Sequence, residues 1–157
     1  MIVTRGDAVQ AGLQVLPGTF AGLMDLYERN YISIRRLIPL MPPVTTREIS
    51  SIPGGLSLYL EVLERFRYTS ELVLTYHFVR EGGVVAEPDL RIRVYHDARL
   101  VEVMSAQLRH RPEFQLNEEN SQQTQLSARW HINRFLYKWL NYCLHQGHRF
   151  DMGSQTL

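Results

Sequence analysis

Apolar residues recur at every second position in the middle of the chain, and this period constrains the fold more than any other feature. Leu56, Leu58, Leu60 and Val62 alternate with Ser57, Tyr59 and Glu61, and Leu72, Leu74, Tyr76 and Phe78 repeat the pattern. A period of two places the apolar residues on one face of a β-strand. A turn is expected near Phe66-Arg67-Tyr68-Thr69, Glu81-Gly82-Gly83 ends the second strand, and Pro88 bounds the next.

The stretch RIRVYHDARLVEV, residues 91–103, reads as a hairpin. A two-residue turn at Asp97-Ala98 would align Val94 with Val101 and Ile92 with Val103 on an apolar face. The same register sets Arg93 opposite Glu102 on the other face. This predicts a solvent-exposed ion pair worth a few tenths of a kcal/mol up to about 1 kcal/mol.

The pair His96-Asp97 could alternatively begin a metal or acid–base site together with Glu102. Such a site requires the side chains to converge, and in this register His96 and Glu102 project from opposite faces. Asp97 suits a turn, because its carboxylate accepts from nearby backbone N–H groups. Since Ala98 is a poor residue for a tight turn, a longer loop stays open.

An amphipathic helix is expected on each side of the strands. The first starts at the N-cap Thr19 and ends before Pro39, because proline disfavours helical geometry in the preceding residue. The second starts at Thr124 or Ser127 and ends at Gln146, before Gly147. Its apolar stripe is formed by Ile132, Leu136, Trp139, Leu140 and Cys143. Its solvent side carries Ser127, His131, Arg134, Lys138, Asn141 and His145.

These segments predict an α+β fold: a four-stranded antiparallel meander covered mainly on one face by an N-terminal and a C-terminal helix. A single domain would span residues 19–147, with tails at 1–18 and 148–157. The stretch between Pro39 and Leu56 is rich in Pro, Ser, Thr and Gly, and it is expected to be a surface connection with room for a short strand. The core side of the sheet is assigned to Leu58, Leu60, Leu72, Leu74, Ile92, Val94, Val101 and Val103.

Composition excludes several function classes. Seventeen basic and sixteen acidic residues leave a formal charge of +1, which disfavours a nucleic-acid partner. One cysteine, Cys143, permits no internal disulfide and no cysteine-based zinc cluster. His145 and His148 offer two ligands without a third, so we expect no metal and no cofactor. No apolar run approaches the roughly 20 residues that span a bilayer, and no signal peptide is recognisable, so we expect a cytoplasmic protein without a membrane partner.

The opposite side of the sheet is the candidate binding surface. It would present Tyr59, Arg91, Arg93, Tyr95, Glu102 and Met104. Aromatic residues interleaved with arginine are typical of protein interfaces, so we favour a non-catalytic interaction or adaptor module with a protein partner. The alternative is a small enzyme or ligand-binding protein that takes an anionic metabolite through Arg67, Arg91 or Arg93. Arg35-Arg36, with Arg65 and Arg67, could also bind an anion. No catalytic residue is assigned.

Four segments in order resemble YqiB-like bacterial proteins, a domain family of unknown function. They are FAGLMDLYERNYISIRRLIP, ERFRYTSELVLT, RIRVYHDARLVEVMSAQ and HINRFLYKWLNYCLHQG, and the resemblance covers Phe20 to Gly147. The most specific matches are Tyr95-His96-Asp97-Ala98 with Glu102-Val103, then Asn133, Phe135-Leu136, Trp139-Leu140 and Cys143-Leu144.

The chain departs from the family between Pro112 and Trp130. Family members carry an aromatic–Tyr-Pro-Asn stretch and a His-Gln-x-Asp-Glu-Lys run there, whereas this chain reads PEFQLNEENSQQTQLSARW. The resemblance implies a small bacterial protein of the cytosol, in a family of unknown function. It supplies no activity and no catalytic residues.

Overall fold

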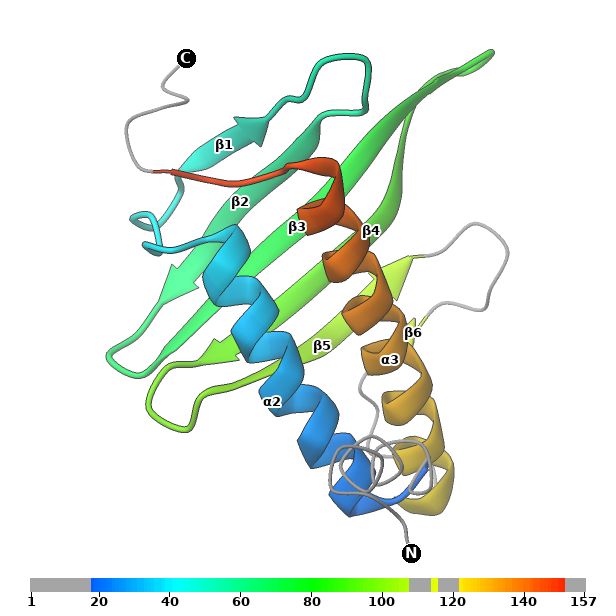
Figure 1. The fold of residues 1–157 in the computed structure, drawn as a ribbon. Helices are drawn as coiled ribbons and strands as arrows, with labels where there is room; N and C mark the ends of the chain where they lie inside the picture. The colour runs from blue at the N-terminus through cyan, green and yellow to red at the C-terminus, as the bar shows by residue number, and fades with distance from the viewer. Residues whose placement is uncertain (1–17, 108–113, 116–121, 152–157) are drawn as a thin grey trace, which may run out of the picture.

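A computed structural model describes residues 18–107, 114–115 and 122–151. The elements in chain order are α2 (Phe20–Leu37), β1 (Arg47–Ser50), β2 (Leu58–Arg65), β3 (Thr69–Arg80), β4 (Gly83–Tyr95), β5 (Leu100–Gln107), β6 (Phe114–Gln115) and α3 (Gln122–Gln146). The strands form one antiparallel sheet in sequence order, with both helices beside it (Figure 1). The α+β class, the antiparallel meander and the two helices are confirmed.

The predicted number of strands is wrong. Besides the four long strands, the described residues include β1, which pairs with β2, and the two-residue β6, which pairs with β5. β1 lies in the stretch rich in Pro, Ser and Thr, and its four residues are too few to establish a period of two. The sheet therefore has five strands of four residues or more, with β6 at its far edge.

Pro88 lies inside β4 and does not mark its start. The pairing of β3 with β4 is interrupted at this point, from Thr75 opposite Asp89 to His77 opposite Ala86. Proline has no N–H to donate to a neighbouring strand, so it is tolerated where a bulge interrupts the hydrogen bonds. β4 therefore starts at Gly83, before Pro88, and runs through the proline to Tyr95.

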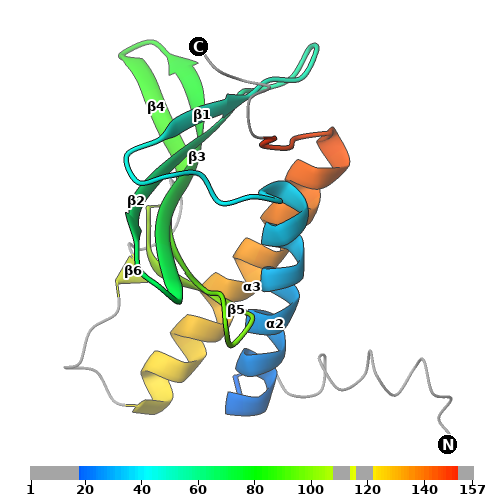
Figure 2. The ribbon, with the colours of Figure 1, turned by 90° about the vertical axis from the view of Figure 1, so that its left-hand side faces the viewer.

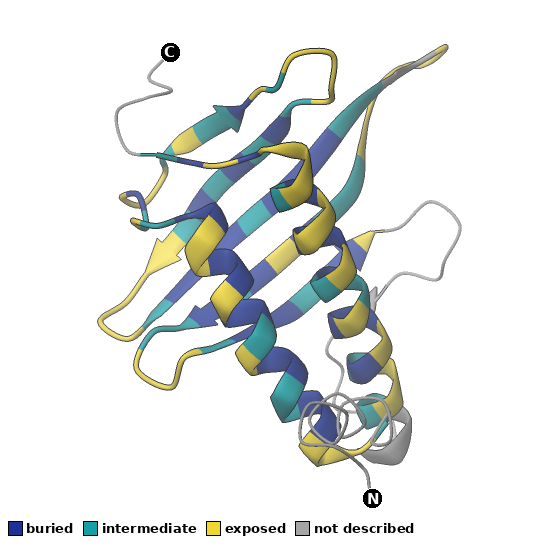
Figure 3. Ribbon diagram, in the orientation of Figure 1, coloured by how far each residue is buried: buried dark blue, intermediate teal, exposed yellow. Residues whose placement is uncertain are grey.

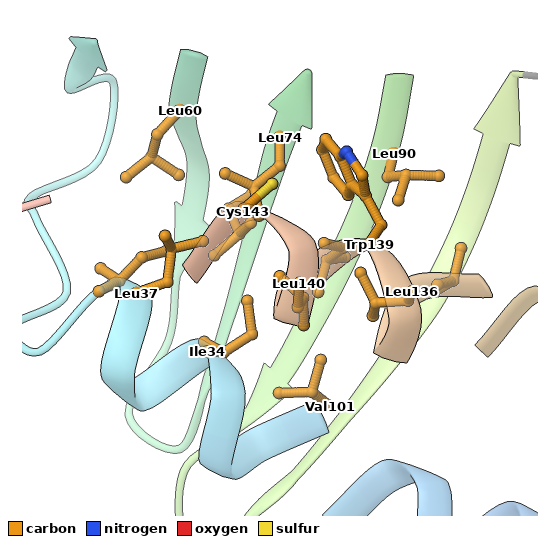
Figure 4. Close-up of a cluster of buried hydrophobic side chains, with 14 of the residues drawn as sticks. Ile34, Leu37, Leu60, Leu74, Leu90, Val101, Leu136, Trp139, Leu140 and Cys143 are labelled. Atoms are coloured by element: carbon orange, nitrogen blue, oxygen red, sulfur yellow. The ribbon is translucent and has the colours of Figure 1, made fainter. Parts of the chain in front are cut away.

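Both helices pack on the same face of the sheet (Figure 2). Along both helices buried residues alternate with exposed ones, as expected for helices that cover the sheet with one face (Figure 3). All eight residues assigned to the core side of the sheet are at most 2% exposed. Figure 4 shows how Ile34 and Leu37 of α2 and Leu136, Trp139, Leu140 and Cys143 of α3 meet Leu60, Leu74, Leu90 and Val101 of the sheet.

The structure confirms the predicted limits of the first helix, and the predicted end and faces of the last one. The side chain of Thr19 caps α2 by accepting from the N–H of Gly22, and the helix ends at Leu37, shortly before Pro39. The whole predicted stripe of α3 is buried, and its predicted solvent side is exposed. α3 starts earlier than expected, at Gln122, and its end is followed by Gly147 in a left-handed conformation. Neither described helix is long and apolar enough to cross a membrane.

Two buried asparagines connect the helices to β5. The Oδ1 atom of Asn133 accepts from the N–H of Val103 at 2.9 Å, and its amide donates to the carbonyl of Arg129 at 2.8 Å. The amide of Asn30 in α2 donates to the carbonyl of Asn133 at 3.1 Å. These bonds fix the lateral position of both helices, because a buried polar group that loses its partner costs about 1–3 kcal/mol.

Packing continues beyond the expected domain boundary at Gly147. The Phe150 side chain is 1% exposed within the main core, and its N–H donates to the carbonyl of Leu37 at 2.8 Å. The hydroxyl of Ser50 lies 2.9 Å from Nδ1 of the buried His148, and accepts from the N–H of Arg149. The packed region therefore reaches at least Phe150.

Candidate functional site

Five of the six candidate residues, all except Met104, lie on the outer face of the sheet, opposite the helices. Strand alternation places Tyr59 of β2 and Arg91, Arg93 and Tyr95 of β4 on this face, because Leu58, Leu90, Ile92 and Val94 are buried on the other. In the views of Figures 1 and 2, none of the described helices lies against it. Tyr59 lies apart from Tyr95, because Tyr59 pairs with Thr75 of β3, and Thr75 in turn pairs with Asp89, several residues from Tyr95 along β4.

Glu71 of β3 binds both candidate arginines. Its Oε1 accepts from Nη2 and Nε of Arg91 at 2.6 and 3.0 Å, and its Oε2 accepts from Nη2 and Nε of Arg93 at 2.8 and 3.2 Å. The Glu71 side chain is 8% exposed, against 47% for Arg91 and 33% for Arg93. Burial by itself would raise the pKa of Glu71, but the hydrogen bonds from Arg93 and Arg91 lower this pKa below its ordinary value.

The predicted ion pair of Arg93 with Glu102 is therefore wrong, although the predicted register is confirmed from Ile92 opposite Val103 to Tyr95 opposite Leu100. Arg93 has a second cross-strand neighbour, Glu71, on its other side. Glu71 offers one carboxylate oxygen to each of two guanidinium groups of β4, a pairing that belongs to the β3–β4 hairpin and not to the β4–β5 hairpin in which the ion pair was predicted.

Glu102 is less exposed to solvent than the predicted surface ion pair requires. It is 9% exposed and accepts a hydrogen bond of 2.5 Å from the hydroxyl of Tyr95. Burial raises the pKa of Tyr27 in α2, and the nearby carboxylate of Glu102 raises it further. Glu102 thus lies between a tyrosine of the outer face and a tyrosine of the first helix. Met104 is half-buried at the bulge that separates the pairs Ile92–Val103 and Arg91–Ser105.

A hollow of about 520 Å³ opens on the outer face over β1, β2 and β3. Its lining includes Ile49, Tyr59, Val73, Thr75 and His77, with Arg47 at its border. The rings of Tyr59 and His77 are stacked, with centroids 4.0 Å apart and an interplanar angle of 24°. We call this feature the outer hollow. Sequence reasoning found Tyr59 but missed His77 and Ile49, because the turn-rich stretch before Leu56 gave no reason to place a strand beside β2.

The interpretation of His96-Asp97 as a turn is confirmed. The loop spans four residues between Tyr95 and Leu100, longer than the two-residue form, and the Asp97 carboxylate accepts from the N–H of Ala98 at 2.9 Å. Nε2 of His96 lies 2.8 Å from the hydroxyl of Ser70. Burial lowers the pKa of His96, and the positive charges of Arg65 and Arg35 lower it further. Its ring thus bonds a serine of the neighbouring strand instead of joining Glu102.

Cys143 does not have the environment of a nucleophile. Its side chain is fully buried and lies 3.5 Å from the hydroxyl of Tyr76, and burial raises the pKa of the thiol to about 11. A reactive cysteine requires the thiolate, which this environment disfavours. Of the two candidate histidine ligands, His145 is exposed, whereas His148 is buried against Ser50. Within the described ranges, no three metal-ligating side chains gather.

Comparisons with known proteins place the chain in a family. Residues 33–149 match the sequence family described as "Protein of unknown function (DUF1249)". The chain belongs to the DUF1249 family. The uncharacterized protein YqiB of Escherichia coli strain K12 is 31% identical over 128 residues, which cover 82% of this chain and 90% of the relative. The YqiB proteins of Escherichia coli O6:H1 and O157:H7 give the same values. No solved structure matches the chain at a significant level.

The DUF1249 match confirms the resemblance inferred from the sequence. The matched part begins in the second half of α2 and includes all six strands and α3, so it contains the outer face and the outer hollow. The stretch predicted to depart from the family pattern, residues 112–130, lies partly outside the described residues, which here include only 114–115 in β6 and 122–130 at the start of α3. Membership of DUF1249 brings no reaction with it, so any function must be argued from the geometry above.

Proposed function

We propose that this DUF1249 protein is a non-catalytic interaction module of the cytoplasm, whose outer face binds a protein partner. The observation that supports this most is the outer hollow: an opening of about 520 Å³ on a sheet face that neither described helix covers. The partner would insert an apolar or aromatic side chain between Ile49, Tyr59 and Val73. A single free thiol, enclosed at Cys143, agrees with a reducing compartment.

Tyr59 is suited to anchor such a partner. Its ring is half-buried and stacked on His77, so little conformational entropy remains for it to lose on binding. Aromatic side chains in this state contribute most to binding where a partner shields them from water. At the border of the outer hollow, Arg47 and Glu61 form an exposed pair at 3.5 Å, a polar rim of the kind that surrounds the apolar centre of an interface.

The charges of the outer face favour a protein partner over an anionic metabolite. Arg91 and Arg93 already give their N–H groups to the two oxygens of Glu71, so an anion would have to compete with an enclosed carboxylate. Arg67, the third arginine of that alternative, lies over the exposed ring of Tyr68 at 5.2 Å. His96 is engaged by Ser70, and Cys143 is held protonated by burial. The described residues therefore supply no acid–base pair near these arginines.

Replacing Tyr59 with alanine should weaken capture of the partner by about 30-fold, which corresponds to the roughly 2 kcal/mol lost when an interface aromatic is truncated. The measurement is quantitative mass spectrometry of proteins captured from native lysate by tagged wild type and variants. Tyr142→Ala is the matched control, because Tyr142 is an aromatic residue of α3 that is 51% exposed on the helix side. Equal capture by the two variants would contradict the proposal.

A further inference from the structure

A second hollow, of about 590 Å³, lies between α2 and the turn that joins β4 to β5. We call it the arginine pocket, and its lining includes Tyr31, Ile32, Arg35, Arg36, Pro39 and Arg99. The turn lies beside α2 in both ribbon views (Figures 1 and 2). Volumes of about 300–1,000 Å³ are usual for small-molecule sites. The arginine pocket lies on the helix side and has no residue in common with the outer hollow.

The arginines of this pocket lack the carboxylate partners that five other arginines of the protein have. Arg29, Arg47, Arg91, Arg93 and Arg149 each have a carboxylate partner. By contrast, none of the three pocket arginines forms an ion pair with a residue that the structure describes. Glu28 is the single acidic residue of the lining, so the pocket keeps an excess of positive charge. Favourable contact with the C-terminal dipole of α2 accounts in part for Arg35 and Arg36, but not for Arg99 on the turn.

Arg99 enters the pocket from a strained backbone. Its φ angle is +60°, a left-handed conformation that glycine adopts easily and that other residues adopt at a cost. Its guanidinium carbon lies 5.6 Å from the centre of the Tyr31 ring, over the wall of the pocket. A glycine would adopt this turn conformation at a lower cost, whereas the arginine places a guanidinium group in the lining of the pocket. Residues held in such a conformation are enriched at active sites, ligand-binding sites and switch regions.

The positive charges near the pocket also affect His96, the first residue of the turn. Burial lowers the pKa of its imidazole, and the positive charges of Arg65 and Arg35 lower it further. The nearby carboxylate of Asp97 acts in the opposite direction without reversing the shift. Arg35 of the pocket therefore acts electrostatically on the residue at the start of this turn.

We propose that the arginine pocket binds a polyanionic small molecule, one that carries two or more phosphate or carboxylate groups. Arg35, Arg36 and Arg99 would hold these groups, since the planar guanidinium matches phosphate and carboxylate oxygens two at a time. The apolar wall of Ile32 and Pro39 would contact the body of the ligand. The site would equip the interaction module to respond to a metabolite, without any covalent step.

Calorimetric titration of the full chain at about 0.15 M salt, with inorganic pyrophosphate and with citrate as probes, tests the proposal. We expect saturable binding of at least one probe. Tighter binding of pyrophosphate would indicate recognition of phosphate groups, and tighter binding of citrate would indicate recognition of carboxylate groups. Arg99→Gly and Arg35→Gln should each weaken binding by tenfold or more, as expected for loss of a charge-assisted contact. Arg67→Gln is the matched control, and it should bind as wild type does.

Arg99→Gly also separates ligand binding from folding. Because glycine relieves the strain at φ +60°, the melting temperature of this variant should stay equal or rise by about 2–4 °C. Weakened binding without loss of stability would support the proposal. Absence of saturable binding of both probes, an equal loss in Arg67→Gln, or a preference for a single-stranded oligonucleotide over both probes would overturn it. Tyr59→Ala should leave the titration unchanged, so failure here is distinguishable from failure of the partner proposal.

Discussion

Replacing Trp139 with alanine should lower the free energy of unfolding by about 3–5 kcal/mol, the usual cost of emptying an aromatic core site. Trp139 is 7% exposed and lies in the centre of the buried stripe of α3, between the helix and the sheet (Figure 4). Its ring meets that of Tyr76 edge-on, with centroids 5.6 Å apart. Denaturant titration of the two proteins, followed by circular dichroism, measures the difference.

Two further variants make this result specific. Tyr142→Ala, also in α3 but exposed, should change stability by no more than about 0.5 kcal/mol. Trp139→Phe should cost less than the alanine change, because it keeps an aromatic ring in place. It also removes the indole N–H, which is buried without a hydrogen-bond partner among the described residues. Equal losses in Trp139→Ala and Tyr142→Ala would mean that α3 is rotated about its axis relative to the structure described above.

The second large effect is expected at Glu71. Glu71→Ala should cost about 2 kcal/mol, because it leaves the guanidinium groups of Arg91 and Arg93 side by side with no carboxylate between them. The loss stays below the 3–5 kcal/mol typical of a fully buried pair, since both arginines are partly exposed and can regain water. Glu61→Ala is the matched control: its exposed pair with Arg47, at 3.5 Å, should contribute less than about 1 kcal/mol.

The same carboxylate gives stability a defined dependence on pH. Since the pKa of Glu71 is lowered by folding, its contribution is fully present above the ordinary pKa near 4.5 and is lost as the pH falls below that value toward the folded pKa. The difference in unfolding free energy between wild type and Glu71→Gln should therefore shrink as the pH falls below 4.5. A difference that stays constant below pH 4.5 would mean that Arg91 and Arg93 do not stabilise the ionised form of Glu71 in the folded protein.

The parts of the fold that could be predicted are those in which apolar residues recur with the period of a strand or a helix. The alternation of Ile92 and Val94 with arginines gave the correct register of the β4–β5 hairpin, and the spacing of Leu136, Trp139 and Cys143 gave the correct face of α3. Both follow from geometry within one or two elements, so no knowledge of the tertiary structure was needed.

The site was less predictable because its contacts join elements that the hairpin alone does not contain. Arg93 has cross-strand neighbours on both sides, and no local pattern favours Glu71 of β3 over Glu102 of β5. Glu102 is enclosed because α2, distant in sequence, brings Tyr27 near it. The outer hollow depends on β1, whose four residues carry no recognisable period. Long-range packing, not local propensity, decides each of these points.

Photo-crosslinking from the outer hollow tests the central claim, that the outer face binds a protein partner, most directly. Benzoylphenylalanine introduced at Val73 stands in the lining of the outer hollow, and the same residue introduced at Tyr142 stands on the exposed side of α3. After irradiation in native lysate, we expect the Val73 protein to give one predominant crosslinked species, reduced when Tyr59→Ala is added, and the Tyr142 protein to lack it. The same crosslinked species from both positions, or none from Val73, would contradict the claim.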